Sequence, residues 1–127
     1  MYLPYNFSSG SWSEASDQRL KKNIENYEES GLDLINKIKV RKFHFNKDDD
    51  KSSKKVGVIA QEIQQVLPHL VSENENKNGK YLGVAYGGMP IYAVKAIQEL
   101  SKTVEWLTKQ NEELVQRILI LENKNKN

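Results

Sequence analysis

The sequence predicts an α+β fold, in which a small globular domain with short helices and a long β-hairpin arm precedes a long C-terminal helix. Two observations predict it: an uninterrupted heptad pattern near the C-terminus, and short apolar runs separated by polar stretches before it. At 127 residues, 38% of them hydrophobic, the chain can bury one modest core. We therefore expect four parts: an upstream segment (1–15), the domain (16–88), the helix (89–122) and a disordered tail (123–127).

The first 15 residues alternate aromatic and small polar types. The aromatic residues are Tyr2, Tyr5, Phe7 and Trp12, and serines surround them. This pattern predicts an extended segment without a core of its own, the end of a longer upstream structure.

Two short helices are expected next. Ser16 or Asp17 can cap a helix that continues through Ile24, because both side chains accept hydrogen bonds from the free amides of a first turn. A second short helix fits residues 31–37.

A β-hairpin arm is expected over about residues 38–60. Residues 38–45 alternate approximately between apolar and polar types, and the apolar run 56–59 follows a polar stretch, 46–55. Two strands joined by so polar a connection predict an arm with a long, charged tip.

A further short helix is expected over residues 61–67. This spacing places Ile63, Val66 and Leu67 on one helical face, and Pro68 ends the helix. The predicted face is apolar and should contribute to the core.

Two short strands and the long helix complete the expected fold. Strands around 70–71 and 81–84 would flank a polar turn at 73–80. Pro90 suits the first turn of a helix, where its missing N–H leaves no hydrogen bond unmade. Nothing interrupts a helix from there to about residue 122.

The long helix carries a heptad seam, which is the strongest physical signal in the sequence. The a positions are Ile97, Val104, Asn111 and Ile118, and the d positions are Leu100, Leu107, Leu114 and Leu121. Because such a seam buries its apolar residues against another helix, it predicts a homo-oligomeric coiled coil.

The heptads leave the number of helices open. β-Branched residues at a, leucine at d and the single polar Asn111 favour a dimer. Apolar Val115 at an e position widens the stripe, and few e and g positions carry charge, which favours a trimer.

Composition argues against several function classes. A net charge of +2 gives no strong field for nucleic acid, and the lack of cysteine with only two histidines argues against a zinc site. Asp48, Asp49 and Asp50 lack the spacing and glycine of a calcium loop. No apolar run approaches the roughly 20 residues that span a bilayer, and the N-terminus lacks signal-peptide features. We expect no metal, cofactor, membrane or nucleic-acid partner.

One pair of residues suggests chemistry. Ser16 and Lys21 lie five positions apart, so a turn can bring the hydroxyl to the amine. Lysine activates a serine only as the neutral amine, and the neighbouring charges of Arg19 and Lys22 favour that form. The alternative is a capping serine and a solvent-exposed lysine, which the spacing alone does not exclude.

Three blocks of the sequence occur in a fixed order. They are Ser16-Asp17-x-Arg19-Leu20-Lys21-x-Asn23-Ile24, then Gly57-Val58-Ile59-Ala60-Gln61-Glu62 with Leu67-Pro68, then Tyr81-Leu82-Gly83-Val84-x-Tyr86 leading into Ala96-Ile97-Gln98-Glu99-Leu100. Together these blocks resemble the endosialidase-type intramolecular chaperones of phage tailspikes and tail appendages. The similarity covers residues 16 to about 121.

The resemblance implies a homotrimer that helps an upstream viral fibre domain of the same polypeptide to fold and then cuts itself off. The bond would be Ala15–Ser16, with Ser16 as nucleophile and Lys21 as general base, in a single-turnover serine peptidase. Asp17, Arg19, Gln61 and Glu62 would be supporting residues. Assembly would take place in the host cytoplasm, and the module would leave the mature fibre.

Two rival readings remain. A non-cleaving trimerisation module would keep the coil and use Ser16 only as a helix cap. The regulatory version of the domain, found in myelin regulatory factor-like proteins, would instead free a DNA-binding fragment from a membrane. The chain also has Ala85 where the family commonly has an acidic residue, which argues against a carboxylate role there.

Overall fold

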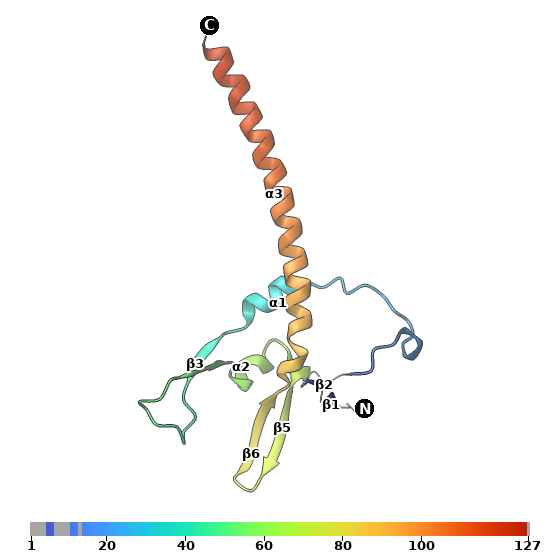
Figure 1. Ribbon diagram of the computed structural model, residues 1–127, viewed down its shortest axis with the longest axis vertical. Coiled ribbons are helices and arrows are strands. Elements are labelled where there is room, and N and C mark those ends of the chain that lie inside the picture. The colour runs from blue at the N-terminus through green and yellow to red at the C-terminus, as the bar shows by residue number, and fades with distance from the viewer. Residues whose placement is uncertain (1–4, 7–10, 13, 127) are drawn as a thin grey trace.

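The computed structural model describes residues 5–6, 11–12 and 14–126. A small base of short helices and three two-stranded antiparallel sheets carries one long helix, so the α+β class is confirmed (Figure 1). In the upstream segment, β1 (Tyr5–Asn6) pairs with β2 (Ser11–Trp12). The expectation of an extended segment falls in part on 1–4, 7–10 and 13, which lie outside the described residues.

The first expected helix is wrong in extent. Only a single 3₁₀ turn, η1 (Gln18–Leu20), forms there, and Lys21 already has extended backbone angles. The Asp17 carboxylate caps η1 by accepting the Arg19 amide. Asn23 has a φ of 55°, a left-handed conformation that does not continue a right-handed helix. The chain therefore leaves this region extended.

The second short helix is confirmed as α1 (Gly31–Lys37). Ser30 caps it, since its hydroxyl accepts the Asp33 amide at 3.1 Å. Gly31 is buried against the long helix, where a Cβ would lie 2.8 Å from the Tyr92 carbonyl oxygen. Glycine at this position lets the two helices approach closely.

The arm is confirmed as a hairpin of β3 (Arg41–Phe43) and β4 (Lys55–Gly57), paired antiparallel. At its tip the Asp48 carboxylate accepts the Phe45 amide at 2.9 Å and pairs with the Lys55 ammonium at 3.0 Å. These contacts close the charged tip on itself.

The core centres on the segment after the arm. Helix α2 (Ala60–Gln64) and the 3₁₀ turn η2 (Pro68–Leu70) bury Ile63, Leu67 and Leu70. Val66 is partly buried against this cluster, which confirms the expected apolar face. The helix itself ends at Gln64, three residues early, and the Gln65 and Val66 amides then bond to carbonyls three residues back.

The strands after the core are longer than expected. β5 (Val71–Asn76) and β6 (Gly79–Val84) pair over their full length, so the turn shrinks from 73–80 to Lys77 and Asn78. Gly79 has a φ of +125°, a conformation that favours glycine. This hairpin projects from the base (Figure 1).

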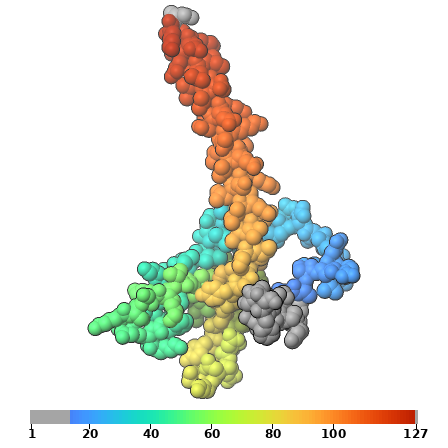
Figure 2. All heavy atoms as spheres, viewed as in Figure 1, coloured from blue at the N-terminus to red at the C-terminus, as the bar shows by residue number. Residues whose placement is uncertain are grey.

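The long helix α3 (Pro90–Asn125) follows the 3₁₀ turn η3 (Tyr86–Gly88) and begins at proline, as expected. It continues three residues past the expected end, so residues 123–125 are helical rather than a disordered tail. Figure 2 shows its C-terminal part standing clear of the base. None of the described helices is long and apolar enough to cross a membrane.

The heptad seam lies uncovered in the single chain. Its apolar side chains are roughly half to two-thirds exposed, from 49% at Leu100 to 66% at Ile97. Among the described residues only Ile63, Leu67, Leu70 and Ala96 are buried hydrophobics. A large apolar stripe therefore remains available for association.

Candidate functional site

The structure brings Ser16 and Lys21 together. The Lys21 ammonium Nζ donates to Ser16 Oγ at 2.6 Å. Turn η1 makes this possible, because the Leu20 and Lys21 amides each reach back three residues and fold the intervening chain. The five-residue spacing thus becomes a direct contact.

Asp17 and Arg19 form an ion pair within the same turn. Asp17 Oδ1 accepts the Arg19 backbone amide at 2.8 Å and Nε at 3.0 Å, and Oδ2 accepts Nη2 at 2.9 Å. These hydrogen bonds hold the pKa of Asp17 below its usual value. Because the guanidinium is paired with Asp17, its charge is not free to act on Lys21, contrary to the sequence expectation. Lys22 is the cation that remains beside Lys21.

The pair lies in water. All residues from 14 to 29 are exposed, and we call this segment the strap. Figure 1 shows it bulging away from the base before the chain returns to α1. Among the described residues of the single chain, therefore, none desolvates Ser16 or Lys21.

Gln61 and Glu62 belong to a different place, the base of the arm. Glu62 accepts Nε and Nη2 of Arg41 at 3.0 and 2.6 Å, and lies 3.7 Å from Lys39 Nζ. The Arg41 hydrogen bond is the main reason that the pKa of Glu62 is lowered. No hydrogen bond among the described residues joins Gln61 or Glu62 to the Ser16–Lys21 pair. The supporting role expected of these two residues thus has no geometric basis within the single chain.

Tyr86 links the arm to the start of the long helix, a contact that sequence reasoning missed. Its hydroxyl accepts the Val58 amide at 3.1 Å. A Cβ at Gly57 would lie 2.8 Å from this hydroxyl, so the glycine makes room for it. The available signal was that Gly57 and Tyr86 both belong to the blocks quoted above.

Glu99 was also missed, although it too lies in a quoted block. Its Oε2 accepts the Leu32 amide at 2.8 Å and the Ser30 hydroxyl at 3.4 Å. The carboxylate lies at the N-terminus of α1, where free amides favour negative charge. Glu99 thus fixes α1, and with it the end of the strap, to α3.

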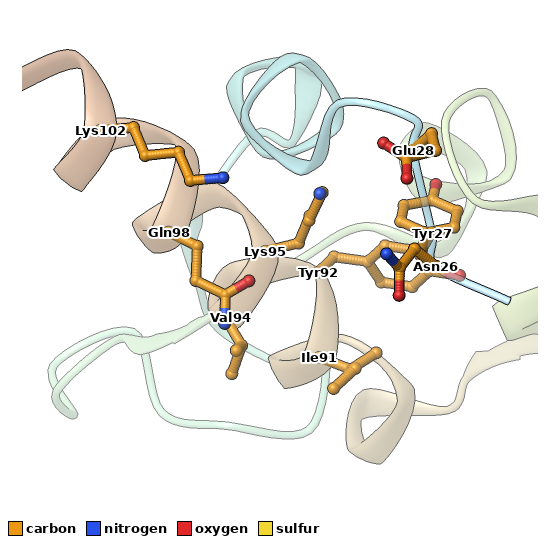
Figure 3. Close-up of a pocket in the computed structure, with 9 residues that line it drawn as sticks. All are labelled: Asn26, Tyr27, Glu28, Ile91, Tyr92, Val94, Lys95, Gln98 and Lys102. Atoms are coloured by element: carbon orange, nitrogen blue, oxygen red, sulfur yellow. The ribbon is translucent and has the colours of Figure 1, made fainter.

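A cleft of about 700 Å³ lies where the strap passes α3 (Figure 3). Tyr27 on the strap packs edge-on against Tyr92 with 6.2 Å between ring centroids, and the Tyr92 hydroxyl meets His69 Nε2 at 2.9 Å. A hydrogen bond to Glu29 raises the pKa of Tyr27. Within the described part of the chain, no three side chains group as metal ligands. The aromatic contact anchors the far end of the strap.

Comparison with known proteins gives one family and several relatives. Residues 16–72 match the family described as the chaperone of endosialidase. The chain is 31% identical over 109 residues to long tail fiber protein Gp37 of Enterobacteria phage Ox2, covering 81% of this chain and 43% of that protein. It is 33% identical over 95 residues to Gp37 of Enterobacteria phage M1, covering 72% and 38%.

A third relative is the probable tail fiber protein of Escherichia phage Phieco32, 34% identical over 97 residues. That alignment covers 75% of this chain but 13% of the relative. The chain thus spans less than half the length of each of these three relatives.

Proposed function

Because the chain belongs, through residues 16–72, to the chaperone of endosialidase family, we propose that it is the assembly module of a phage tail fibre protein. It acts as an intramolecular chaperone for an upstream fibre domain of the same polypeptide. The tail fibre proteins among its relatives support this role. The module assembles in the host cytoplasm and leaves the fibre when its work is complete.

Trimerisation by α3 is the chaperone step. The exposed heptad seam supplies an association surface, and apolar Val115 beside it widens the stripe as a three-stranded coil requires. Holding three chains together raises the local concentration of the fibre segments. That lowers the cost of the slow, non-local pairing by which β-rich shafts form.

Self-cleavage at Ala15–Ser16 is the release step. Lys21, as the neutral amine, takes the proton of the Ser16 hydroxyl, and Oγ attacks the Ala15 carbonyl carbon. The C–N bond to Ser16 breaks as the nitrogen receives a proton from Lys21, leaving an ester. Water then hydrolyses the ester, which frees the Ala15 carboxylate and restores the Ser16 hydroxyl. Cleavage after assembly makes the fibre kinetically stable.

The 2.6 Å contact between Lys21 Nζ and Ser16 Oγ is the single observation that carries the cleavage proposal. Each catalytic role needs direct contact between the two groups. In the described form the Lys21 ammonium donates this hydrogen bond to the Ser16 hydroxyl. Activation reverses this hydrogen bond once the amine is neutral.

Variants of a chain extended upstream into the fibre test the proposal. Ser16→Ala and Lys21→Ala should each abolish the appearance of a shorter fragment on a denaturing gel. Lys77→Ala removes a lysine on the exposed turn between β5 and β6, far along the chain from the pair, and should still be cut. Cleavage in Lys21→Ala at the rate of the parent chain would rule out the lysine as base.

A non-cleaving trimerisation module is the second candidate. The exposure of the strap favours it, because no described residue covers the Ser16–Lys21 pair and excludes water from it. This module would remain uncut in every variant, including the parent chain, while still assembling through α3.

A further inference from the structure

The strap carries apolar side chains that its own chain does not cover. Leu20 is 71% exposed and Ile24 is 67% exposed, on a segment whose only regular structure is η1. They flank Lys21, so the catalytic pair lies on an apolar surface that faces solvent. Such a surface is typical of a docking segment.

One face of the arm is uncovered in the same way. The β3–β4 register places Val56 opposite Lys42, and Val40 precedes Lys42 by two residues on the same face. Val40 is 71% exposed and Val56 is 68% exposed. The arm therefore presents two valines and a lysine on one side.

The arm is basic, and the C-terminal part of the strap is acidic. Residues 38–55 of the arm contain seven lysines and arginines against three aspartates. Residues 24–29 of the strap contain three glutamates and no basic residue, whereas residues 16–22 contain Arg19, Lys21 and Lys22 against Asp17. Opposite charge supplies both attraction and register for a contact between them.

The two surfaces project from opposite sides of α3 (Figure 1). An arm therefore does not meet its own strap. When copies are arranged by rotation about an axis along α3, the arm of each copy points toward the strap of the next. Such a head-to-tail contact closes into a ring, as a cyclic oligomer requires.

We propose that the strap of each copy docks on the arm of a second copy of this chain. Leu20 and Ile24 pack against Val40 and Val56, while the strap glutamates face the arm lysines. This contact rests on the proposed self-association. It adds a surface through which the strap of one copy meets the arm of the next. Docking covers the Ser16–Lys21 pair, so the second copy supplies the desolvation that the single chain lacks.

Disulfide trapping tests this contact directly, because the chain has no cysteine of its own. Ile24→Cys and Val56→Cys are placed in separate, differently tagged chains, both with Ser16→Ala so that no chain is cut at Ala15–Ser16. After co-expression and oxidation, we expect a disulfide between one chain of each kind. Pairing Ile24→Cys with Lys77→Cys, on the exposed turn of the β5–β6 hairpin, is the control and should give little product.

Two outcomes overturn the proposal. The first is free thiols in the assembled oligomer. The second concerns one chain that carries both cysteines: a disulfide within that chain would show that an arm meets its own strap. Neither depends on cleavage, since Ser16 is absent, so failure here is distinct from failure of the proposed peptidase.

Charge reversal gives a second readout. Replacing Glu25, Glu28 and Glu29 by lysine should lower the trapping yield roughly threefold to tenfold. Lys42→Glu with Lys54→Glu in the partner chain should restore it. High salt should weaken the effect of reversal, because exposed charges are screened. An unchanged yield in the reversed chain would contradict the charge pairing.

Discussion

At the scale of single residues, Asp17 organises the turn that brings Ser16 and Lys21 together. It caps η1 and holds Arg19 by two further hydrogen bonds, all within the loop that brings Lys21 to Ser16. The residue contacts no reacting atom, so it acts as a positioning residue.

Removal of the Asp17 side chain should therefore slow cleavage without preventing assembly. We expect Asp17→Ala to lower the cleavage rate roughly fivefold, because the side chain that caps the turn is lost. Asp17→Asn keeps an acceptor for the Arg19 amide and should retain more activity. A rate in Asp17→Ala equal to that of the parent chain would show that the turn does not depend on this cap.

The ion pair of Glu62 with Arg41 gives a pH dependence. The pKa of Glu62 is lowered in the folded chain, so the pair stabilises the fold above the ordinary pKa of glutamate. That contribution is lost as pH falls through the lowered value. The protection factors of amides at the base of the arm, which correct for the pH dependence of intrinsic exchange, should therefore fall on acidification. Glu62→Gln should exchange faster near neutral pH and lose this part of the pH dependence.

At the scale of elements, the packing of α1 on α3 depends on the absence of a side chain at Gly31. Gly31→Ala places a Cβ 2.8 Å from both the Lys95 Cβ and the Tyr92 carbonyl oxygen. We expect a loss of about 1–3 kcal/mol in the free energy of unfolding, as overpacking typically costs, measured by chemical denaturation. Gly87→Ala is the matched control, because a Cβ there meets nothing within 4 Å. Equal stability of the two variants would contradict this packing account.

Elements set by local signals were predictable from the sequence. α1 and the start of α3 follow from the Ser30 cap and from Pro90. The predicted helix through Ile24 was wrong because the Asp17 carboxylate binds Arg19 and closes a short turn. Helix propensity does not reveal that pairing. The length of β5 was missed because its outer residues are polar on both faces and show no alternation.

In the candidate site, too, contacts between residues close in the sequence were predictable and long-range contacts were not. The Ser16–Lys21 contact is local, so its spacing along the chain was informative. Glu99 and Tyr86 act across 67 and 28 positions, and only the fold brings them to their partners. The spacing that predicted the dyad could not predict those contacts.

At the scale of the whole molecule, the small core leaves much apolar surface that the proposed association would bury. Most apolar side chains on α3 and the strap are exposed, whereas the core of the base is a few residues around Ile63. Stability should therefore depend on chain concentration, because association stabilises only the folded state. We expect the melting temperature to rise with concentration; a constant value would contradict this dependence.

The predicted seam contains one polar residue, Asn111. Asn111 occupies an a position, where a polar residue fixes register and number of helices at a cost in stability. Asn111→Ile should raise the melting temperature and broaden the range of oligomers seen by native mass spectrometry. A single unchanged oligomer with lower stability would show that Asn111 is not buried in the seam.

Under the proposed function, this chain frees itself from the fibre that it assembles. Intact-mass spectrometry of an upstream-extended chain after expression would detect this release. We expect one product whose mass corresponds to a chain beginning at Ser16, and a separate upstream product that ends at Ala15. A full-length trimer that stays uncut would contradict self-release and leave a folding clamp whose serine lies beside a lysine without catalysing cleavage.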